Sequence, residues 1–327
     1  HTTKGGLFTV QLNVAPRIIY RDNADWGVFK DALEANPTTP LMNPENQAQY
    51  YNFNGQVVGS NPVERQVLET NHSDTKLLDW DGTLKLNLLP LFAKNGDSAH
   101  NLSTQIMFAD HQYSNNDSWF RPSTSTECIN NGHEGEASRS YSKDRQYILE
   151  WLTNYSTRIA DRHNIKAMIG YSYQYTQSSG FNAYNKDFPN DGLGADNLGS
   201  GEWAKEEGEV MMGSYKNDSK LISFFGRVSY DYEGKYLFTA SLRHEGSSKF
   251  GHNHKWGNFP AVSAGWRISQ ENFMKDVTWV NDLKIRADYG VTGNQDFGSY
   301  NSINTMSGFG YYYYNGKYFQ VWGPGKN

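Results

Sequence analysis

Two histidines and a nearby carboxylate are the first residues whose types could do chemistry. His252 and His254 stand two positions apart and Glu245 precedes them, so the three could offer two imidazoles and a carboxylate to a metal. They fall in a Gly-containing loop without the fixed spacing of a helix, and we interpret them as solvated loop residues. We predict no metal site in this chain.

A serine motif and an acidic cluster are the other candidates for catalysis. Ser263 lies in AVSAG, which resembles a nucleophile elbow with Ala261 in place of the first Gly. Such an elbow needs a strained strand-to-helix turn, whereas the alternation around Ser263 places it mid-strand. Four glutamates could bind a cation or resemble a glycosidase pair, although a solvated loop is the simpler interpretation: Glu202, Glu206, Glu207 and Glu209. We predict no catalytic residue, no cofactor and no enzyme activity.

The composition favours an all-β protein without a nucleic-acid partner. Aromatic residues make up 15% of the chain, charged residues 20%, and there are 31 glycines. The net charge of -5 gives no electrostatic reason to expect nucleic acid. Mean hydropathy is -0.75, and no apolar run approaches the roughly 18 residues of a membrane-spanning helix. A barrel strand needs only about 9–11 alternating residues, so the hydropathy does not exclude a membrane barrel.

Residues 224–295 read as four consecutive strands with strict alternation of apolar and polar positions. One face is apolar: Tyr236, Phe238, Ala240, Leu242, Val262, Ala264, Trp266, Ile268, Leu283, Ile285, Ala287, Tyr289 and Val291. The other is polar: Thr239, Ser241, Arg243, Ser263, Gly265, Arg267, Lys284, Arg286 and Asp288. A sandwich would bury the apolar face in a core. A membrane barrel would turn it to lipid and the polar face to a lumen.

Connections between the predicted strands alternate between short and long. Further strands are predicted at 7–20, 77–91, 101–113, 141–160 and 165–177. Long connections follow residues 20, 113 and 177, whereas the connections near 93–100, 161–164 and 233–235 are short. A helix ended by Pro37 is predicted at 25–36. Because outer-membrane barrels have short turns at one end and long loops at the other, we predict about ten barrel strands.

Several stretches resemble a known family. FGRVSYDYEGKYLFTASLRHEGSSKFG, WGNFPAVSAGWRISQENFMK and WVNDLKIRADYGVTGNQ resemble the C-terminal barrel signature of SusC/RagA-type TonB-dependent outer-membrane transporters. ADWGVFKDALEANPTTP is similar to a long extracellular loop of that family. The resemblance extends through most of the chain and is most specific over residues 224–295.

The resemblance implies an all-β fold, an antiparallel transmembrane β-barrel segment with about ten strands of a plugged barrel of roughly 22. It implies import of bulky nutrients, glycan oligomers or peptides, across a Gram-negative outer membrane, with a SusD-like surface lipoprotein and TonB as partners. We expect residues 1–327 to be a partial barrel from which the plug domain, the N-terminal extension with the TonB-contacting segment, and the last barrel strands are absent. The alternative is a secreted all-β glycan-binding or glycan-cleaving protein with a sandwich core.

Two sets of residues are expected to serve such a transporter. The first is charged and is expected to face the lumen and anchor the plug: Arg227, Arg243, Arg267, Lys284, Arg286 and Asp288. The second is aromatic and is expected in extracellular loops, where flat rings could pack on sugars or peptide side chains: Trp119, Phe120, Phe309, Tyr311, Tyr312, Tyr313 and Tyr314. An aromatic girdle at the membrane interface is the alternative for this second set.

Overall fold

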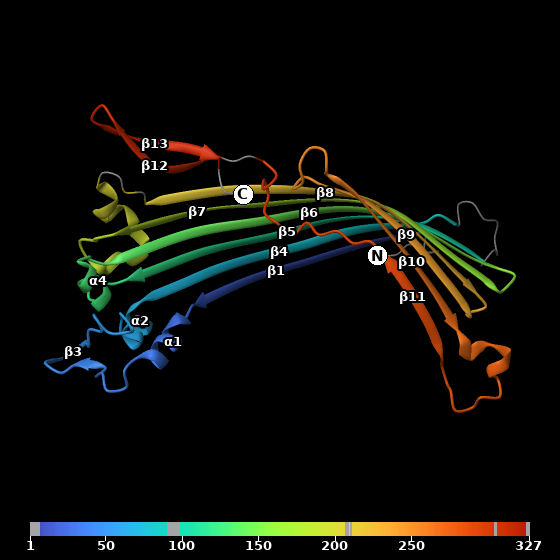
Figure 1. Ribbon diagram of the computed structural model, residues 1–327, viewed down its shortest axis with the longest axis horizontal. Coiled ribbons are helices and arrows are strands. Elements are labelled where there is room, and N and C mark those ends of the chain that lie inside the picture. The colour runs from blue at the N-terminus through green and yellow to red at the C-terminus, as the bar shows by residue number, and fades with distance from the viewer. Residues whose placement is uncertain (1–6, 90–98, 207–208, 210, 304–305, 325–327) are drawn as a thin grey trace.

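One antiparallel sheet of nine strands dominates the structure, a computed structural model that describes residues 7–89, 99–206, 209, 211–303 and 306–324. Figure 1 shows this sheet as a single curved layer, in which each strand pairs with the next along the chain. Its strands are β1 (Phe8–Asp22), β4 (Thr70–Asn87), β5 (His100–Arg121), β6 (Glu136–Ile159), β7 (His163–Lys186), β8 (Met212–Tyr232), β9 (Tyr236–Ser247), β10 (Trp256–Arg267) and β11 (Lys284–Gly290). The predicted all-β architecture is confirmed.

Shorter elements occupy the connections. The helices are α1 (Gly27–Glu34), α2 (Pro62–Leu68), α4 (Thr126–Asn131) and the 3-10 helices η1 (Asp191–Ser200), η2 (Trp203–Lys205), η3 (Ile268–Gln270) and η4 (Asn272–Met274). Two small hairpins pair β2 (Met42–Asn43) with β3 (Asn46–Tyr50), and β12 (Met306–Tyr314) with β13 (Lys317–Pro324). Helix α1 confirms the helix predicted at 25–36. Among the described residues, no helix combines the length and apolar character needed to cross a bilayer.

The register confirms the two predicted faces. Ala240 lies opposite Val262, which lies opposite Tyr289, and directly opposite residues share one face of a sheet. We call this side the apolar face and the other the polar face. Phe238 is 49% exposed and Ile285 58% exposed, because no second sheet covers the apolar face in the described part of the chain. The apolar side chains therefore do not form the dry core that a sandwich requires.

Charged residues are segregated between the two faces. Directly opposite residues form a row across β4 to β7 on the apolar face: Trp80, Asp110, Tyr147 and Tyr175. Between this row and the end with the short turns, the described apolar face of β4 to β11 carries no Lys, Arg, Asp or Glu. The polar face carries them there, as Lys85, Glu150 and Arg227 illustrate. A charge facing lipid near the bilayer midplane costs about 2–4 kcal/mol, so this segregation fits a barrel wall.

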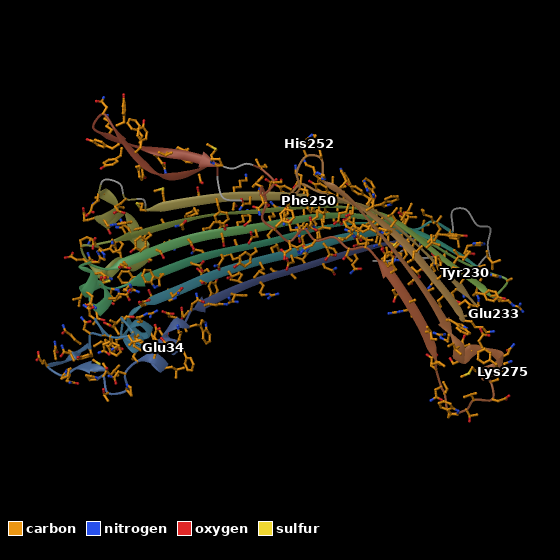
Figure 2. All side chains as sticks on the ribbon, in the orientation of Figure 1. Glu34, Tyr230, Glu233, Phe250, His252 and Lys275 are labelled. Atoms are coloured by element: carbon orange, nitrogen blue, oxygen red, sulfur yellow. The ribbon has the colours of Figure 1, made fainter. Side chains whose placement is uncertain are left out.

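Tight turns close the strands at one end, which we call the short-turn end. Ala160 and Asp161 have φ of 49° and 54°, and Glu233 and Gly234 have 51° and 69°. The Lys235 N–H donates to the Tyr232 carbonyl at 2.9 Å. Two consecutive residues with positive φ make type I′ turns, whose twist matches that of the flanking strands. Figure 2 places Tyr230, Glu233 and Lys275 at this end and Glu34 at the opposite, long-loop end.

The strands β4 to β8 all run further toward the long-loop end than the sequence predicts, and β5, β7 and β8 gain most. β5 continues to Arg121 instead of ending at residue 113, β7 continues to Lys186, and β8 begins at Met212 rather than near 224. The added segments have polar side chains on both faces, so they lack the apolar alternation used to find strands. The prediction that Trp119 and Phe120 lie in a loop is wrong, because both belong to β5. Most of the predicted short turn at 93–100 lies outside the described residues.

Candidate functional site on the polar face

The six charged residues predicted to face a lumen all lie on the polar face. Arg227 stands opposite Ser241 on β9, Arg286 opposite Gly265 on β10, and Arg267 opposite Lys284. They come from β8 to β11, because the register repeats the same alternation on four consecutive strands. Their shared side of the sheet is therefore established, and their role against a plug stays a prediction.

Some of these charges already have partners on the same strand or in the next connection. Arg243 Nε lies 2.5 Å from Glu245 Oε2, and its Nη2 donates to Ser223 Oγ at 2.8 Å. Arg286 Nε lies 3.1 Å from Asp288 Oδ2, and Arg267 Nε lies 3.8 Å from Asp282 Oδ1. These pairs lower the net charge of the wall at β9 to β11.

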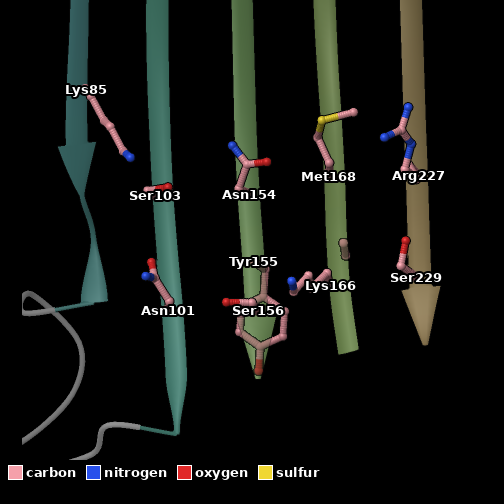
Figure 3. A pocket seen from close by; sticks show the side chains of 11 residues that line it. Lys85, Asn101, Ser103, Asn154, Tyr155, Ser156, Lys166, Met168, Arg227 and Ser229 are labelled. Carbon is pink, nitrogen blue, oxygen red and sulfur yellow. The ribbon is translucent and has the colours of Figure 1, made fainter. Parts of the chain in front are cut away.

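Arg227 belongs to a different group, which sequence reasoning did not find. Together with Lys85 and Lys166 it lines a shallow hollow of about 380 Å³ on the polar face. Figure 3 shows these side chains on neighbouring antiparallel strands, with amides and hydroxyls between them. The polar lining consists of Asn101, Ser103, Asn154, Ser156 and Ser229. The residues come from five strands, and only the register across β4 to β8 brings them together.

The chemistry of this hollow is that of a donor-rich wall. No Asp or Glu is among its lining residues, and all three cations are exposed. Amides and hydroxyls donate as well as accept, so the hollow suits carboxylates and backbone carbonyls of a protein segment. It holds no nucleophile paired with a base. Its flexible cations suit non-covalent binding of a protein segment better than catalysis.

The aromatic residues predicted to bind ligand fall in three different environments. Trp119 lies on the polar face, where its Nε1 donates to Glu69 Oε2 at 3.0 Å and Arg121 sits 5.0 Å from its ring centroid. Phe120 points to the other face and is only 8% exposed, packed with Ala137 and Phe188. Its ring is covered by this packing.

The remaining aromatics lie on the β12–β13 hairpin, which forms its own two-stranded sheet. Tyr311 to Tyr314 are all more than half exposed. The ring centroids of Tyr313 and Tyr318 are 5.0 Å apart, and those of Tyr312 and Phe319 are 5.8 Å apart. The side chain of Phe309 lies outside the described residues. Ligand binding by this hairpin stays a prediction.

The residues considered for catalysis or metal binding stay apart in space. Ser263 lies in the middle of β10 between Thr239 and Asp288 on the neighbouring strands, as predicted. His252 Nδ1 contacts Asn253 Oδ1 at 2.9 Å. In the part of the chain that the structure describes, no group of three His, Cys, Asp or Glu side chains is placed to hold a metal ion.

The long connections pack into one platform at the long-loop end. Glu64 on α2 is 2% exposed and accepts a hydrogen bond from the Thr126 N–H of α4 at 2.8 Å. Asn61 caps α2 and also donates to the Leu41 carbonyl at 3.1 Å. Arg65 joins α2 to α1 through Asp31 at 2.7 Å. Buried polar contacts therefore fix loops that are far apart in the sequence.

Comparison with known proteins shows which proteins the chain is similar to. A scan against models of protein families gave no match. Over 166 residues the chain is 41% identical to a TonB-dependent receptor of Formosa agariphila, a match covering 50% of this chain and 15% of that protein. Over 85 residues it is 45% identical to the TonB-dependent receptor SusC of Bacteroides thetaiotaomicron, covering 26% and 8%. These matches support the predicted resemblance of the chain to a fragment of a SusC-type TonB-dependent receptor.

A solved structure agrees with the SusC-type fold. The RagAB peptide importer in its closed-closed state superposes with a TM-score of 0.71 at 18% identity, covering 96% of this chain and 34% of the other. At that identity the likeness shows the fold alone, which is an all-β barrel segment. The chain spans 15% and 8% of the length of the two curated receptors. The activity, substrate and partners of a whole receptor therefore do not follow from these matches alone.

Proposed function

We propose that this chain forms part of the barrel wall of a TonB-dependent importer in a Gram-negative outer membrane. The importer takes up bulky nutrients, either glycan oligomers or peptides. The observation that carries the proposal is the segregation of charge: over most of β4 to β11 the apolar face has no Lys, Arg, Asp or Glu, while the polar face has many. A wall between lipid and a wet lumen needs this division. A sandwich would also keep its inner face uncharged, but it would bury that face, whereas Phe238 and Ile285 are exposed and no second sheet covers them among the described residues.

The polar face is proposed to hold a plug domain that belongs to the same receptor. The hollow around Lys85, Lys166 and Arg227 offers cations and amide donors, and no carboxylate, to a facing protein surface. Arg243, Arg267, Lys284, Arg286 and Asp288 extend this wall across β9 to β11. Residues 1–327 then form a partial barrel whose plug and TonB-contacting segment are supplied elsewhere in the receptor.

The platform of loops is proposed to meet a SusD-like surface lipoprotein. Helix α1 presents Phe29 and Leu33, which are 71% and 72% exposed, and Trp26 beside it is 87% exposed. Clusters of exposed large apolar side chains on a rigid support are typical of protein interaction sites. Helix α1 is held to α2 by the Arg65 ion pairs, so the cluster has such a support.

Cell fractionation and growth test the importer against its alternative. The tagged full-length receptor should sediment with outer membranes and need detergent for release. Deleting its gene should abolish growth on one class of oligomer, glycan or peptide, and a strain without TonB should show the same loss. A receptor that is soluble and binds or cleaves glycans without detergent would instead support a secreted protein.

Charge reversal tests the plug proposal separately. The triple variant Lys85→Glu, Lys166→Glu and Arg227→Glu should loosen the plug and make cells sensitive to a large antibiotic that the intact outer membrane excludes. Lys275→Glu, in the exposed connector after β10, is the matched control and should leave cells resistant. Equal resistance of both variants at equal surface abundance would argue against plug anchoring by this wall.

A further inference from the structure

A group of five cations lies on the apolar face beside the long-loop end, and we call it the cationic belt. Its members are Lys76 on β4, Lys143 and Arg145 on β6, and Lys216 and Lys220 on β8. On each of these strands the belt begins at the outward position next to Leu78, Tyr147 or Ile222, beyond which this face carries only isolated apolar or aromatic side chains such as Tyr141 and Met212. The belt is therefore continuous with the surface proposed to touch lipid tails.

The register gives the belt a regular arrangement. Lys76, Ser114, Lys143, Ser179 and Lys216 are directly opposite neighbours on five adjacent strands. Adjacent strands are about 4.8 Å apart, so successive lysines in this row are roughly 10 Å apart with a hydroxyl between them. Gln112 and Gln177 add amides on β5 and β7 in the next row. The row thus alternates charge with neutral hydrogen-bond donors.

Most of the belt lacks an ion-pair partner. Lys76, Lys143, Lys216 and Lys220 are exposed, and no ion pair joins any of them to a carboxylate among the described residues. Three carboxylates share this part of the face: Asp74, Asp110 and Asp218. Asp110 forms an ion pair with Arg145, and Asp218, which accepts a hydrogen bond from the neutral Tyr300 hydroxyl, keeps its negative charge. The five cations of the belt therefore exceed the three carboxylates of this part of the face by two charges.

We propose that the cationic belt binds the phosphate groups of anionic lipids in the outer leaflet. The proposal rests on the outer-membrane location proposed above. The aromatic side chains of Trp80, Tyr147 and Tyr175 mark the interface, since aromatic rings settle where hydrocarbon meets headgroups. Lys76, Lys143 and Lys216 stand four residues beyond this row, about 13 Å, whereas Lys220 lies in the row opposite Tyr175. Their flexible stems let the ammonium groups reach the headgroup layer.

Headgroup phosphates suit this surface better than a protein partner does. Clusters of Lys and Arg beside a membrane-embedded segment attract anionic lipids, and phosphate oxygens accept from lysine, serine and amide donors together. The belt follows a curved wall for five strands without a groove or an exposed large apolar anchor between its cations. A lipid layer matches such a continuous curved surface.

Lipid retention by the purified full-length receptor tests the proposal. The receptor would be exchanged into vesicles or micelles containing a phosphorylated glycolipid or its dephosphorylated counterpart, and bound lipid would be counted by native mass spectrometry. The variant Lys76→Gln, Lys143→Gln, Lys216→Gln and Lys220→Gln should retain at least about fivefold less phosphorylated lipid. The matched control Lys30→Gln, Lys205→Gln, Lys255→Gln and Lys275→Gln removes four lysines outside the belt and should retain the normal amount.

The outcomes separate this proposal from its rivals. Equal retention by the belt variant and the control, or equal retention of the dephosphorylated lipid, would overturn it. Displacement by millimolar inorganic phosphate would point to a simple anion site instead, and loss of a co-purifying protein with lipid unchanged would point to a protein partner. The heat-dependent mobility of a folded barrel on SDS gels checks that both variants fold. A receptor that binds the lipid but is absent from outer membranes would contradict the proposed location and not the belt chemistry.

Discussion

Arg145 on β6 holds the carboxylate of Asp110 on β5 through two hydrogen bonds, with Nε to Oδ1 at 3.0 Å and Nη2 to Oδ2 at 2.7 Å. Asp110 is 2% exposed although it lies on the apolar face. The Arg145 guanidinium also lies 4.4 Å from the ring centroid of Tyr147. The Arg145 cation, which can itself reach solvent, thus stabilises a charged carboxylate at the edge of the apolar region.

Removing Arg145 should destabilise the barrel more than removing the charge of Asp110. Arg145→Met leaves a buried carboxylate with the Gln112 amide as a donor but without a cation, which we expect to cost about 3 kcal/mol. Asp110→Asn keeps an acceptor and lets the guanidinium turn toward headgroups, so we expect about 1 kcal/mol. Urea unfolding of the receptor in micelles measures both. The double variant should recover part of the Arg145→Met loss, and equal costs for the two single variants would contradict this explanation.

The sequence predicted the barrel strands well where one face meets an apolar environment. The alternation through Phe238, Val262 and Ile285 depends on neighbouring residues alone, so it located β9 to β11 and assigned both faces. The polar extension of β5 to Trp119 and Phe120 escaped detection, because neither face there is apolar. The hollow around Lys85, Lys166 and Arg227 was missed for another reason: residues on separate strands are brought together by register, which no local pattern specifies.

The contact between Glu64 and Thr126 should hold the loop platform together without stabilising the barrel. Glu64→Ala leaves the buried N–H and hydroxyl of Thr126 without their acceptor, which costs about 1–3 kcal/mol of local stability. We expect protease to cut residues 23–69 at least about tenfold faster, with unchanged unfolding of the barrel. Glu34→Ala is the control, since its ion pair with Lys30 at 3.6 Å is exposed and contributes little. Identical digestion of the two variants would show that the contact does not secure the platform.

The ring of Phe225 on the neighbouring strand leaves no room for a side chain at Gly170. The two residues are directly opposite, and a Cβ at Gly170 would lie 2.5 Å from Phe225 Cε2 and 2.7 Å from Leu152 Cδ2. Gly170→Ala should therefore cost about 1–3 kcal/mol of unfolding free energy through overpacking. Gly82→Ala is the matched control, because nothing lies within 4 Å of its added Cβ. Adding Phe225→Leu should rescue Gly170→Ala, and a neutral Gly170→Ala would rule out this close packing.

Cys128 on α4 should react with alkylating agents only when the platform opens. Its side chain is fully buried, and burial raises the pKa of the thiol from 9.0 to about 12. At pH 8 the folded receptor therefore holds almost no thiolate at this position. The thiolate, which is the reactive form, becomes abundant only as the pH approaches 12. We expect maleimide labelling of the peptide containing Cys128, followed by mass spectrometry, to be at least about a hundredfold slower than in SDS-unfolded receptor. Because Thr126 joins α4 to Glu64, Glu64→Ala should speed this labelling while Glu34→Ala should not. Fast labelling of the folded receptor at pH 8 would show that the α4 region is open to reagent in solution.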